Sequence, residues 1–281
     1  MGKPPAWTGL SHPILEIDVK TVTVCDASIE YTEHGSGPPL IFLHGGDGPD
    51  RGAAIIDILA RSFRVIYPSH PGFGGSTRPA GVTSADDLSY LYIGFMHALG
   101  LTDVRLAGVS FGGWIAAEIA VKSPAALTGL FLVSPLGVKF AGPTEVEIFD
   151  LFSVPAYEQA VYLYETPALR SPDYAAMPEA QVMALAQARE SFGLYGWRPV
   201  LNNPKLKQRL GFISCPTLLI WGGNDRVVAS TARTAWAEAV PGADMQLIAG
   251  AGHYVHADAP AAVADAILDF AGKGQSMKKA G

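Results

Sequence analysis

The stretch LAGVSFGGWIAAEIA, from Leu106 to Ala120, decides the fold of this chain. An apolar run leads into one polar side chain, Ser110, and an apolar run resumes at Phe111. Gly108 and Gly112 flank the serine two positions to either side, which fits the pattern G-x-S-x-G. A turn from a buried strand into a buried helix is so tight that the serine is expected to take a strained backbone, and glycine removes the collisions at both flanking positions. The pattern therefore predicts a serine hydroxyl at the carboxyl edge of a sheet, although a serine beside glycine also occurs as a plain helix N-cap.

Short apolar runs that end in glycine or turn residues recur along the chain, and most are followed by helical periodicity. The expected strands are Leu40–Leu43, Arg64–Tyr67, Val104–Val109, Thr128–Val133, Thr217–Trp221 and Met245–Ile248. The expected helices are Ile55–Ser62, Ser84–Leu99, Phe111–Lys122, Ala229–Val240 and Pro260–Phe270. This alternation predicts an α/β fold with a mostly parallel, doubly wound sheet covered by helices on both faces. Residues Thr21–Glu33 are expected to add an antiparallel piece at the N-terminal side.

The strand pattern stops between Pro135 and about Pro204, where apolar and aromatic residues recur at helical spacing. We therefore predict one α/β core formed by residues 1–136 and 205–281, with a helical cap inserted at 137–204. The aromatic and large apolar residues of this insertion are Phe149, Phe152, Tyr157, Tyr162, Tyr164, Met183, Phe192 and Trp197. Most of them are expected to pack inside the cap, and some to face the cleft. Arg198 could meet a substrate carboxylate, but exposure to solvent is the simpler expectation.

The bulk composition narrows the function classes. The chain has 281 residues, of which 49% are hydrophobic and 16% charged, so we expect it to fold around a substantial core. A net charge of −6 gives no basic surface for nucleic acid or for an anionic membrane, and it favours a small neutral or apolar partner. Cys25 and Cys215 stand far apart and outside any metal-ligand spacing, so we expect two buried free thiols and neither a disulfide nor a zinc site.

The first twenty residues contain prolines and charged residues that interrupt every apolar run of signal-peptide length. Nothing later in the chain approaches the length of a membrane span. The cytoplasm is therefore the expected compartment. No sequence feature decides between a monomer and a homodimer.

A serine hydroxyl is a weak nucleophile near neutral pH, so it needs a base that is itself oriented by an acid. The stretch LLIWGGNDRVV places Asp225 just past an expected strand, and LIAGAGHYVHADAP places His253 just past the next one. Both residues are therefore expected at the same sheet edge as Ser110. Asp225 could instead be a plain turn residue after Gly-Gly-Asn, and His256 is the obvious rival to His253.

The stretch LIFLHGGDGPD supplies a fourth element, because its glycines follow the strand expected beside the serine strand. A backbone N–H of this loop, for which we choose Gly46, would act with the N–H of Phe111 as an oxyanion hole for acyl transfer. His44 precedes the turn, so we interpret it as a residue that braces the loop and not as a base.

These elements together resemble the α/β-hydrolase superfamily, in its lidded branch of cofactor-free serine hydrolases. The resemblance spans nearly the whole chain and rests on His44-Gly45-Gly46, SHPGFGGST at 69–77, the serine turn, WGGNDRVV at 221–228 and GAGHYVHADAP at 250–260. It implies a nucleophile at Ser110, a general base at His253 and an orienting acid at Asp225, with no metal and no organic cofactor. Many relatives carry an aspartate two residues before the proline of the second motif, where this chain has Ser69.

The resemblance is specific for the fold and weakly specific for the substrate. The aromatic, charge-poor cap favours a small to medium, mostly apolar carboxylic ester or lactone, cleaved through an acyl-enzyme. A hydrolase of carbon–carbon bonds in ring-fission products is the alternative, because Tyr254 directly after His253 is similar to the aromatic residue that such enzymes carry. A ligand receptor of the same fold, without turnover, is a third possibility.

Overall fold

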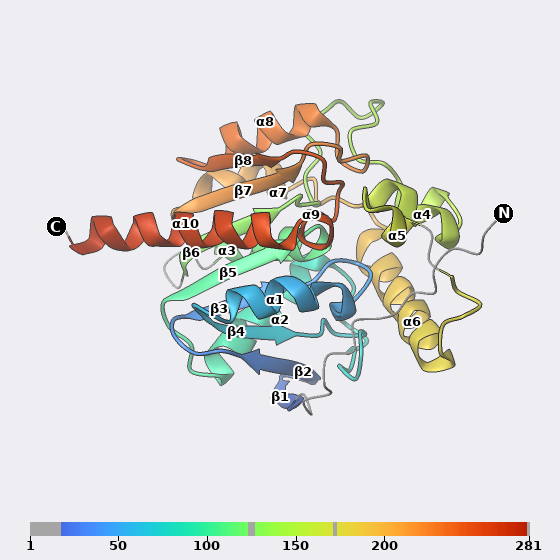
Figure 1. Ribbon diagram of the computed structural model, residues 1–281, viewed down its shortest axis with the longest axis horizontal. Coiled ribbons are helices and arrows are strands. Elements are labelled where there is room, and N and C mark those ends of the chain that lie inside the picture. Colours follow the sequence, from blue (N-terminus) through green and yellow to red (C-terminus); the bar gives the residue numbers. More distant parts are fainter. Residues whose placement is uncertain (1–17, 123–126, 171–172, 280–281) are drawn as a thin grey trace.

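The core of the molecule is an eight-stranded sheet in the order β1-β2-β4-β3-β5-β6-β7-β8 (Figure 1). The computed structural model describes residues 18–122, 127–170 and 173–279. The strands are β1 (Lys20–Val24), β2 (Ala27–His34), β3 (Pro39–Leu43), β4 (Arg64–Pro68), β5 (Val104–Val109), β6 (Leu127–Val133), β7 (Thr217–Gly222) and β8 (Asp244–Ile248). Strands β3 to β8 are parallel, and the β1–β2 hairpin joins antiparallel to β4. The predicted fold class and each predicted strand are confirmed.

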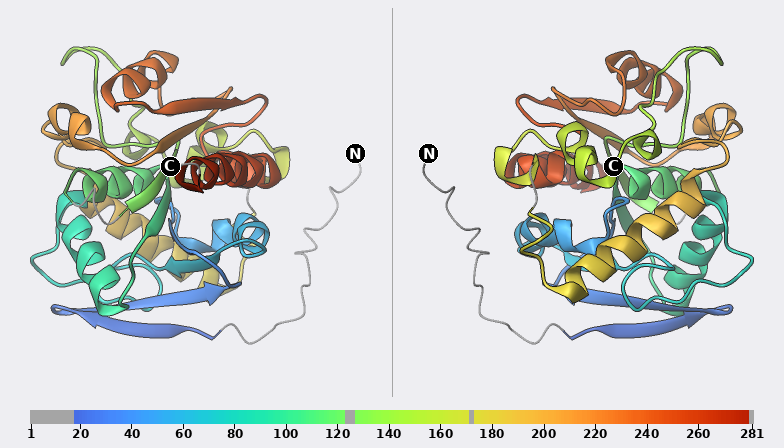
Figure 2. Two further views of the ribbon diagram at one scale, coloured as in Figure 1. Left: turned by 90° about the vertical axis from the view of Figure 1, so that its left-hand side faces the viewer. Right: turned by 90° about the vertical axis from the view of Figure 1, so that its right-hand side faces the viewer.

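Helices cover both faces of the sheet, as the near-continuous apolar strands require. On one face α1 (Ala53–Leu59) packs with α10 (Pro260–Lys279), and on the other α2 (Ala85–Ala98) packs with α3 (Phe111–Lys122), as Figure 2 shows. The remaining core helices are α7 (Leu206–Arg209), α8 (Ser230–Ala239) and α9 (Val255–Asp258), with single 3₁₀ turns at Pro49–Gly52 and Leu210–Phe212. Strands β5, β6 and β7 are almost fully buried, so the core centres on the strand that leads to Ser110.

Residues 137–204, which we call the cap segment, lie between β6 and α7. Their elements are a 3₁₀ turn at Leu151–Ser153 and the helices α4 (Ala156–Leu163), α5 (Pro167–Arg170) and α6 (Glu179–Gly196), which lie together at one end of the sheet (Figure 1). The two ends of the segment meet, because Gly137 N–H donates to Leu201 O at 3.0 Å and Asn203 N–H donates to Gly137 O at 2.8 Å. The segment therefore leaves the core and returns to it at the same place.

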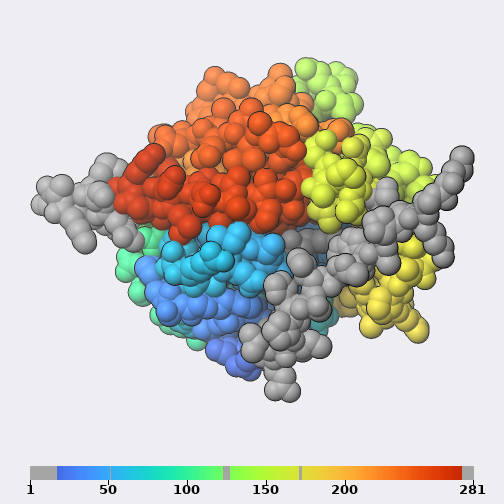
Figure 3. All heavy atoms as spheres, in the orientation of Figure 1, coloured from blue at the N-terminus to red at the C-terminus, as the bar shows by residue number. Residues whose placement is uncertain are grey.

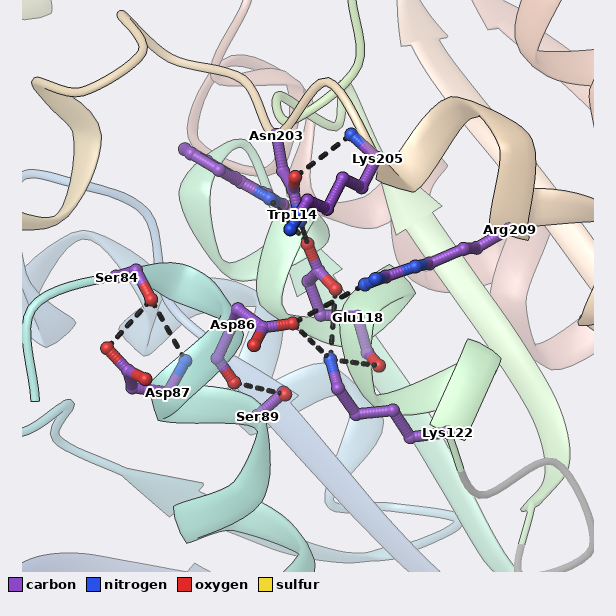
Figure 4. Close-up of polar contacts among 10 residues, drawn as sticks. All are labelled: Ser84, Asp86, Asp87, Ser89, Trp114, Glu118, Lys122, Asn203, Lys205 and Arg209. Atoms are coloured by element: carbon purple, nitrogen blue, oxygen red, sulfur yellow. Dashed lines mark hydrogen bonds and ion pairs between the residues drawn. The ribbon is translucent and has the colours of Figure 1, made fainter.

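A buried polar cluster attaches this junction to α3 (Figure 4). The Glu118 side chain has no exposed surface, and it accepts hydrogen bonds from Asn203 Nδ2 at 2.7 Å and Lys122 Nζ at 3.0 Å. Lys122 Nζ also donates to Asp86 Oδ1 of α2 at 2.8 Å. A buried carboxylate is costly unless it is paired, and here one carboxylate joins the end of the cap segment to the helix that begins after Ser110.

The structure corrects the prediction for one cysteine. Cys215 is buried, but Cys25 is exposed, because it occupies the two-residue turn between β1 and β2 with a φ of 51°. Both cysteines are free, as predicted. Arg198 is exposed, in agreement with the simpler expectation for it.

The aromatic residues of the cap segment divide in a way that the sequence did not indicate. Tyr164 and Phe192 are buried, whereas Tyr157 and Trp197 are exposed.

No helix within residues 18–122, 127–170 and 173–279 is long and apolar enough to cross a bilayer. Most of the twenty residues used to judge targeting lie outside the described residues.

Candidate active site

Ser110 occupies the predicted tight turn between β5 and α3. Its φ of 53° is in the left-handed region, which costs energy for a residue with a Cβ atom. A Cβ atom on Gly108 would lie 2.2 Å from Gly112 O, and one on Gly112 would lie 2.2 Å from Leu43 O. Both contacts are with backbone atoms that cannot turn away, so the two flanking positions require glycine, for the steric reason that the sequence pattern suggested.

The loops of Asp225 and His253 come together at the ends of β7 and β8. Asn224 N–H donates to Ala251 O at 2.9 Å, and Gly223 N–H donates to Ile248 O at 2.8 Å. A Cβ atom on Gly222 would lie 2.0 Å from Gly252 O, so the close approach of the loops depends on glycine at this position. Two residues that are distant from Ser110 in sequence thus arrive side by side at the edge of the sheet.

The three predicted side chains form one hydrogen-bonded row. His253 Nε2 lies 2.8 Å from Ser110 Oγ, and His253 Nδ1 lies 2.9 Å from Asp225 Oδ2. The side chains of His253 and Asp225 are fully buried. The rival His256 lies in α9, where its ring contacts the rings of Phe42 and Tyr254. The structure therefore brings Ser110, His253 and Asp225 together and places His256 elsewhere.

The surroundings of Asp225 keep its carboxyl group ionised. Burial by itself would raise the pKa of Asp225, but the charge and the hydrogen bond of His253 lower it, and so do the N–H groups of Val227 and Val228. The net direction is a lowered pKa. Both N–H groups donate to Asp225 Oδ1, at 2.8 and 2.9 Å. Because an ionised carboxylate only accepts, Nδ1 of His253 carries the proton and Nε2 is left to accept from the Ser110 hydroxyl.

The loop after β3 lies next to the first turn of α3. A Cβ atom on Gly112 would lie 2.2 Å from Leu43 O and 2.5 Å from His44 O, so the start of α3, where Phe111 precedes Gly112, meets the beginning of the His44-Gly45-Gly46 loop. Gly46 is covered from the other side by the cap segment, since a Cβ atom on it would lie 2.7 Å from the ring of Phe192. The ring of Phe192 also lies 5.2 Å from the ring of Phe111, so both residues chosen as oxyanion donors border Phe192, and their role remains a prediction.

His44 braces this loop through a second buried histidine, in agreement with our interpretation of it. His70 N–H donates to His44 Nε2 at 3.0 Å, and His44 Nδ1 donates to Gly45 O at 2.7 Å. His70 Nε2 donates in turn to His44 O at 2.9 Å, and its Nδ1 accepts from Tyr92 Oη at 2.5 Å. This pattern assigns a neutral ring to both histidines. Burial lowers the pKa of His44 to about 4 and also lowers the pKa of His70.

Ser69 stands where many relatives carry an aspartate, and the loop that follows it is held by other hydrogen bonds. Gly75 N–H donates to Glu30 Oε2 at 2.8 Å, and Ser76 Oγ donates to Ser69 O at 2.9 Å. Glu30 belongs to β2, so a carboxylate from another strand holds the loop.

Sequence reasoning missed Asp258, which lies five positions after His253. Its carboxylate accepts hydrogen bonds from the N–H groups of Gly252 at 2.8 Å, Glu165 at 2.9 Å and Thr166 at 2.8 Å. No periodicity or motif that we used signals these contacts, because two of the three donors lie more than 90 positions away in the chain.

Comparisons with known proteins agree with this architecture. The model of the alpha/beta hydrolase family matches residues 40–266. A 2-hydroxy-6-oxo-6-phenylhexa-2,4-dienoate hydrolase of Comamonas testosteroni is 30% identical over 225 residues, which cover 72% of this chain and 77% of the relative. A protein of the same name from Burkholderia cepacia is 28% identical over 82% of this chain and 87% of its own. A crystal structure of a membrane phospholipase A is similar with a TM-score of 0.77 and 25% identity, covering 92% of this chain and 87% of that one. The chain therefore belongs to the alpha/beta hydrolase family and is a hydrolase.

Proposed function

We propose that this protein hydrolyses small to medium, mostly apolar carboxylic esters or lactones with a Ser110–His253–Asp225 triad. One observation carries the proposal. The His253 ring lies between Ser110 Oγ and Asp225 Oδ2, within hydrogen-bond distance of both. This row can take a proton from an alcohol while the alcohol oxygen becomes bonded to carbon.

The first step forms an acyl-enzyme. Ser110 Oγ attacks the carbonyl carbon, and its proton moves to His253 Nε2, while Asp225 stabilises the imidazolium through Nδ1. The N–H groups of Gly46 and Phe111 donate to the carbonyl oxygen as it becomes negative. His253 then gives its proton to the leaving alcohol oxygen as the bond from carbon to that oxygen breaks.

The second step releases the acid. A water molecule gives a proton to His253 Nε2 and attacks the acyl carbon, and the proton then returns to Ser110 Oγ as the acyl–serine bond breaks. Every proton transfer uses side chains of this chain, so the proposal includes neither a metal nor an organic cofactor.

Aromatic side chains beside the serine support an apolar substrate. The ring of Phe192 in α6 lies 5.2 Å from the ring of Phe111 and 5.2 Å from the ring of Phe152. We propose that the cap segment covers the site, so that such rings, and not charged groups, meet the acyl or alcohol part of a small-molecule ester.

Carbon–carbon bond hydrolysis is the second candidate, and two observations favour it. The ring of Tyr254 stacks on His253, with centroids 5.6 Å apart. Two of the relatives are named 2-hydroxy-6-oxo-6-phenylhexa-2,4-dienoate hydrolase. The same triad would serve this reaction, since a ketone carbon would take the place of the ester carbon.

A substrate panel separates the candidates. We would assay the purified protein with nitrophenyl acetate, butyrate and octanoate, a simple lactone, and 2-hydroxy-6-oxo-6-phenylhexa-2,4-dienoate, with Ser110→Ala as the matched inactive variant. We expect multiple turnovers of an ester or lactone that the variant lacks. Turnover of the dienoate alone would replace the ester proposal with the second candidate. Binding without turnover of any member would support the receptor reading instead.

A further inference from the structure

The loops that carry His253 and Asp225 are both attached to one short stretch of the cap segment, residues 161–166. We propose that this stretch positions the acid and the base of the triad, and that Asp258 is the positioning residue that couples it to His253. The inference rests on the proposed function, because it assigns a catalytic consequence to contacts around that triad.

The backbone on each side of His253 is fixed through the cap segment. On one side, Tyr254 N–H donates to Leu163 O at 2.8 Å. On the other side, Gly252 N–H donates to Asp258 Oδ2 at 2.8 Å, and the same oxygen accepts from Glu165 N–H at 2.9 Å. A Cβ atom on Gly252 would lie 3.0 Å from Leu163 O, so the two segments are in direct contact. The backbone at His253 therefore cannot move without breaking hydrogen bonds that attach it to the cap segment.

The chemistry of this junction requires a carboxylate at position 258. Three N–H donors point at its two oxygens, two at Oδ2 and the third, from Thr166, at Oδ1 with a distance of 2.8 Å. Hydrogen bonds to an ionised acceptor are stronger than those between neutral groups. An asparagine of the same shape would offer one oxygen and one NH₂ group, so its NH₂ would face an N–H donor and at least one bond would be lost.

The acid loop is attached to the same stretch by the residue after Asp225. Arg226 Nη1 donates to Val161 O at 2.9 Å, and Arg226 Nη2 forms an ion pair with the Glu165 carboxylate. Glu165 therefore contributes to both attachments, through its backbone N–H to Asp258 and through its side chain to Arg226. Displacement of the stretch would disturb the acid and the base together.

The stretch also reaches the third loop of the site. Tyr164 Oη donates to Asp47 Oδ2 at 3.3 Å, and Asp47 follows the predicted oxyanion donor Gly46. The Tyr164 ring lies 5.3 Å from the ring of Tyr254. In Figure 3 the yellow-green atoms of α4 and α5 lie directly against the orange-red atoms of the C-terminal part of the chain. Residues 161–166 thus contact all three loops that converge on Ser110.

These contacts matter for rate because proton transfer depends on atomic placement. A displacement of about 1 Å in a reacting group can cost about 10²-fold in rate. The Ser110–His253 and His253–Asp225 hydrogen bonds span 2.8 and 2.9 Å, so a shift of that size would break either of them. Loss of the Asp258 contacts should therefore lower kcat more than it changes KM, because Asp258 accepts from backbone N–H groups and not from the aromatic rings proposed to meet the substrate.

Asp258→Asn is the central test, with Asp87→Asn as the matched control. Asp87 is also a half-buried aspartate that accepts a backbone N–H, from Thr83 at 3.0 Å, but it lies at the start of α2. We expect Asp258→Asn to lower kcat about 10- to 100-fold with a change in KM of less than about threefold, and to slow labelling of Ser110 by a fluorophosphonate to the same degree. Asp87→Asn should change both rates by less than about twofold, whatever it does to the melting temperature.

Arg226→Gln tests the attachment of the Asp225 loop to residues 161–166. It keeps the inference testable if the Asp258→Asn variant does not fold. It should also lower kcat, and the double variant should lose less than the product of the two single effects, because both act through one stretch. Hydrogen exchange of the unaltered protein adds a third measurement. The amides of Gly252, Glu165 and Thr166 should be protected to a similar degree.

The inference is overturned if a folded Asp258→Asn or Arg226→Gln variant keeps kcat and labelling rate near the level of Asp87→Asn, or if the three amides exchange as fast as those of exposed loops. An unaltered protein that neither turns over esters nor reacts with the fluorophosphonate would instead overturn the proposed function. The two failures are therefore distinguishable.

Discussion

Gly112 approaches Leu43 so closely that a Cβ atom on the glycine would lie 2.2 Å from the carbonyl oxygen of the leucine. The start of α3 and the end of β3 thus share a contact that no side chain larger than hydrogen allows. Gly112→Ala should force the two backbones apart and destabilise the protein by about 3 kcal/mol, at the upper end of the cost of overpacking. Urea unfolding would measure the loss. Gly211→Ala is the matched control, since a Cβ atom there would meet nothing within 4 Å.

Ser110→Ala removes the proposed nucleophile and leaves every backbone contact of the turn in place. Because alanine also has a Cβ atom, the strain at a φ of 53° is unchanged and the fold should be retained. We expect kcat to fall by about 10³- to 10⁶-fold, the range for serine triads. Steady-state hydrolysis of the best ester, with circular dichroism as a check on folding, would measure it. Turnover near the original level would remove Ser110 from the nucleophile role.

Asp225→Asn should abolish most activity through the wrong histidine tautomer. The N–H groups of Val227 and Val228 would keep the single amide oxygen as their acceptor, which turns the NH₂ group toward His253 Nδ1. Nδ1 would then have to accept, so the ring proton would move to Nε2 and face Ser110. We expect kcat to fall by about 10⁴-fold with little change in stability. Asp173→Asn, at an exposed turn, should keep full activity.

The buried pair of histidines should make the protein sensitive to mild acid. Burial lowers the pKa of His44 from 6.5 to about 4, so between these values the unfolded chain binds a proton that the folded chain does not. The contribution of the neutral His44 ring to the free energy of unfolding is therefore fully present above about pH 6.5. It is lost as the pH falls toward 4, and the loss for His44 alone is roughly 3 kcal/mol. The pKa of Asp225 is lowered from 3.8, so its own contribution is lost at lower pH still.

Urea midpoints at pH 7, 5.5 and 4.5 would test this prediction, with His44→Gln as the comparison. The variant is expected to be less stable at pH 7 but to lose less stability on acidification, because glutamine does not titrate. Parallel losses in the two proteins would show that His44 does not cause the acid sensitivity.

Removal of Lys122 should destabilise the junction between α3 and the cap segment. Lys122→Met leaves the fully buried Glu118 carboxylate without its cationic partner, and this should cost about 3 to 5 kcal/mol. Asp86 is 37% exposed and still has Arg209 at 3.8 Å, so it contributes little of the loss. Adding Glu118→Gln should restore part of the stability, because a neutral side chain can still accept from Asn203. Equal instability of the single and double variants would contradict a charge-based cause.

The sequence by itself determined the strands, the tight serine turn and the chain order of serine, acid and base. These features are local, since a strand follows from a short apolar run, and the turn at Ser110 follows from glycines two residues to either side. The same local reasoning was wrong for Cys25, because a two-residue hairpin turn exposes a side chain that composition alone would bury.

Only the tertiary structure decided which distant groups meet. It selected His253 over His256 as the ring beside Ser110, and it buried Tyr164 while it exposed Tyr157, seven positions earlier in α4. It also revealed the contacts of Asp258 and Glu118, each of which accepts from at least one remote segment of the chain. The physical reason is that a hydrogen bond or a packed ring depends on the distance between atoms in space. The spacing of residue types along the chain does not specify that distance for loops more than 90 positions apart.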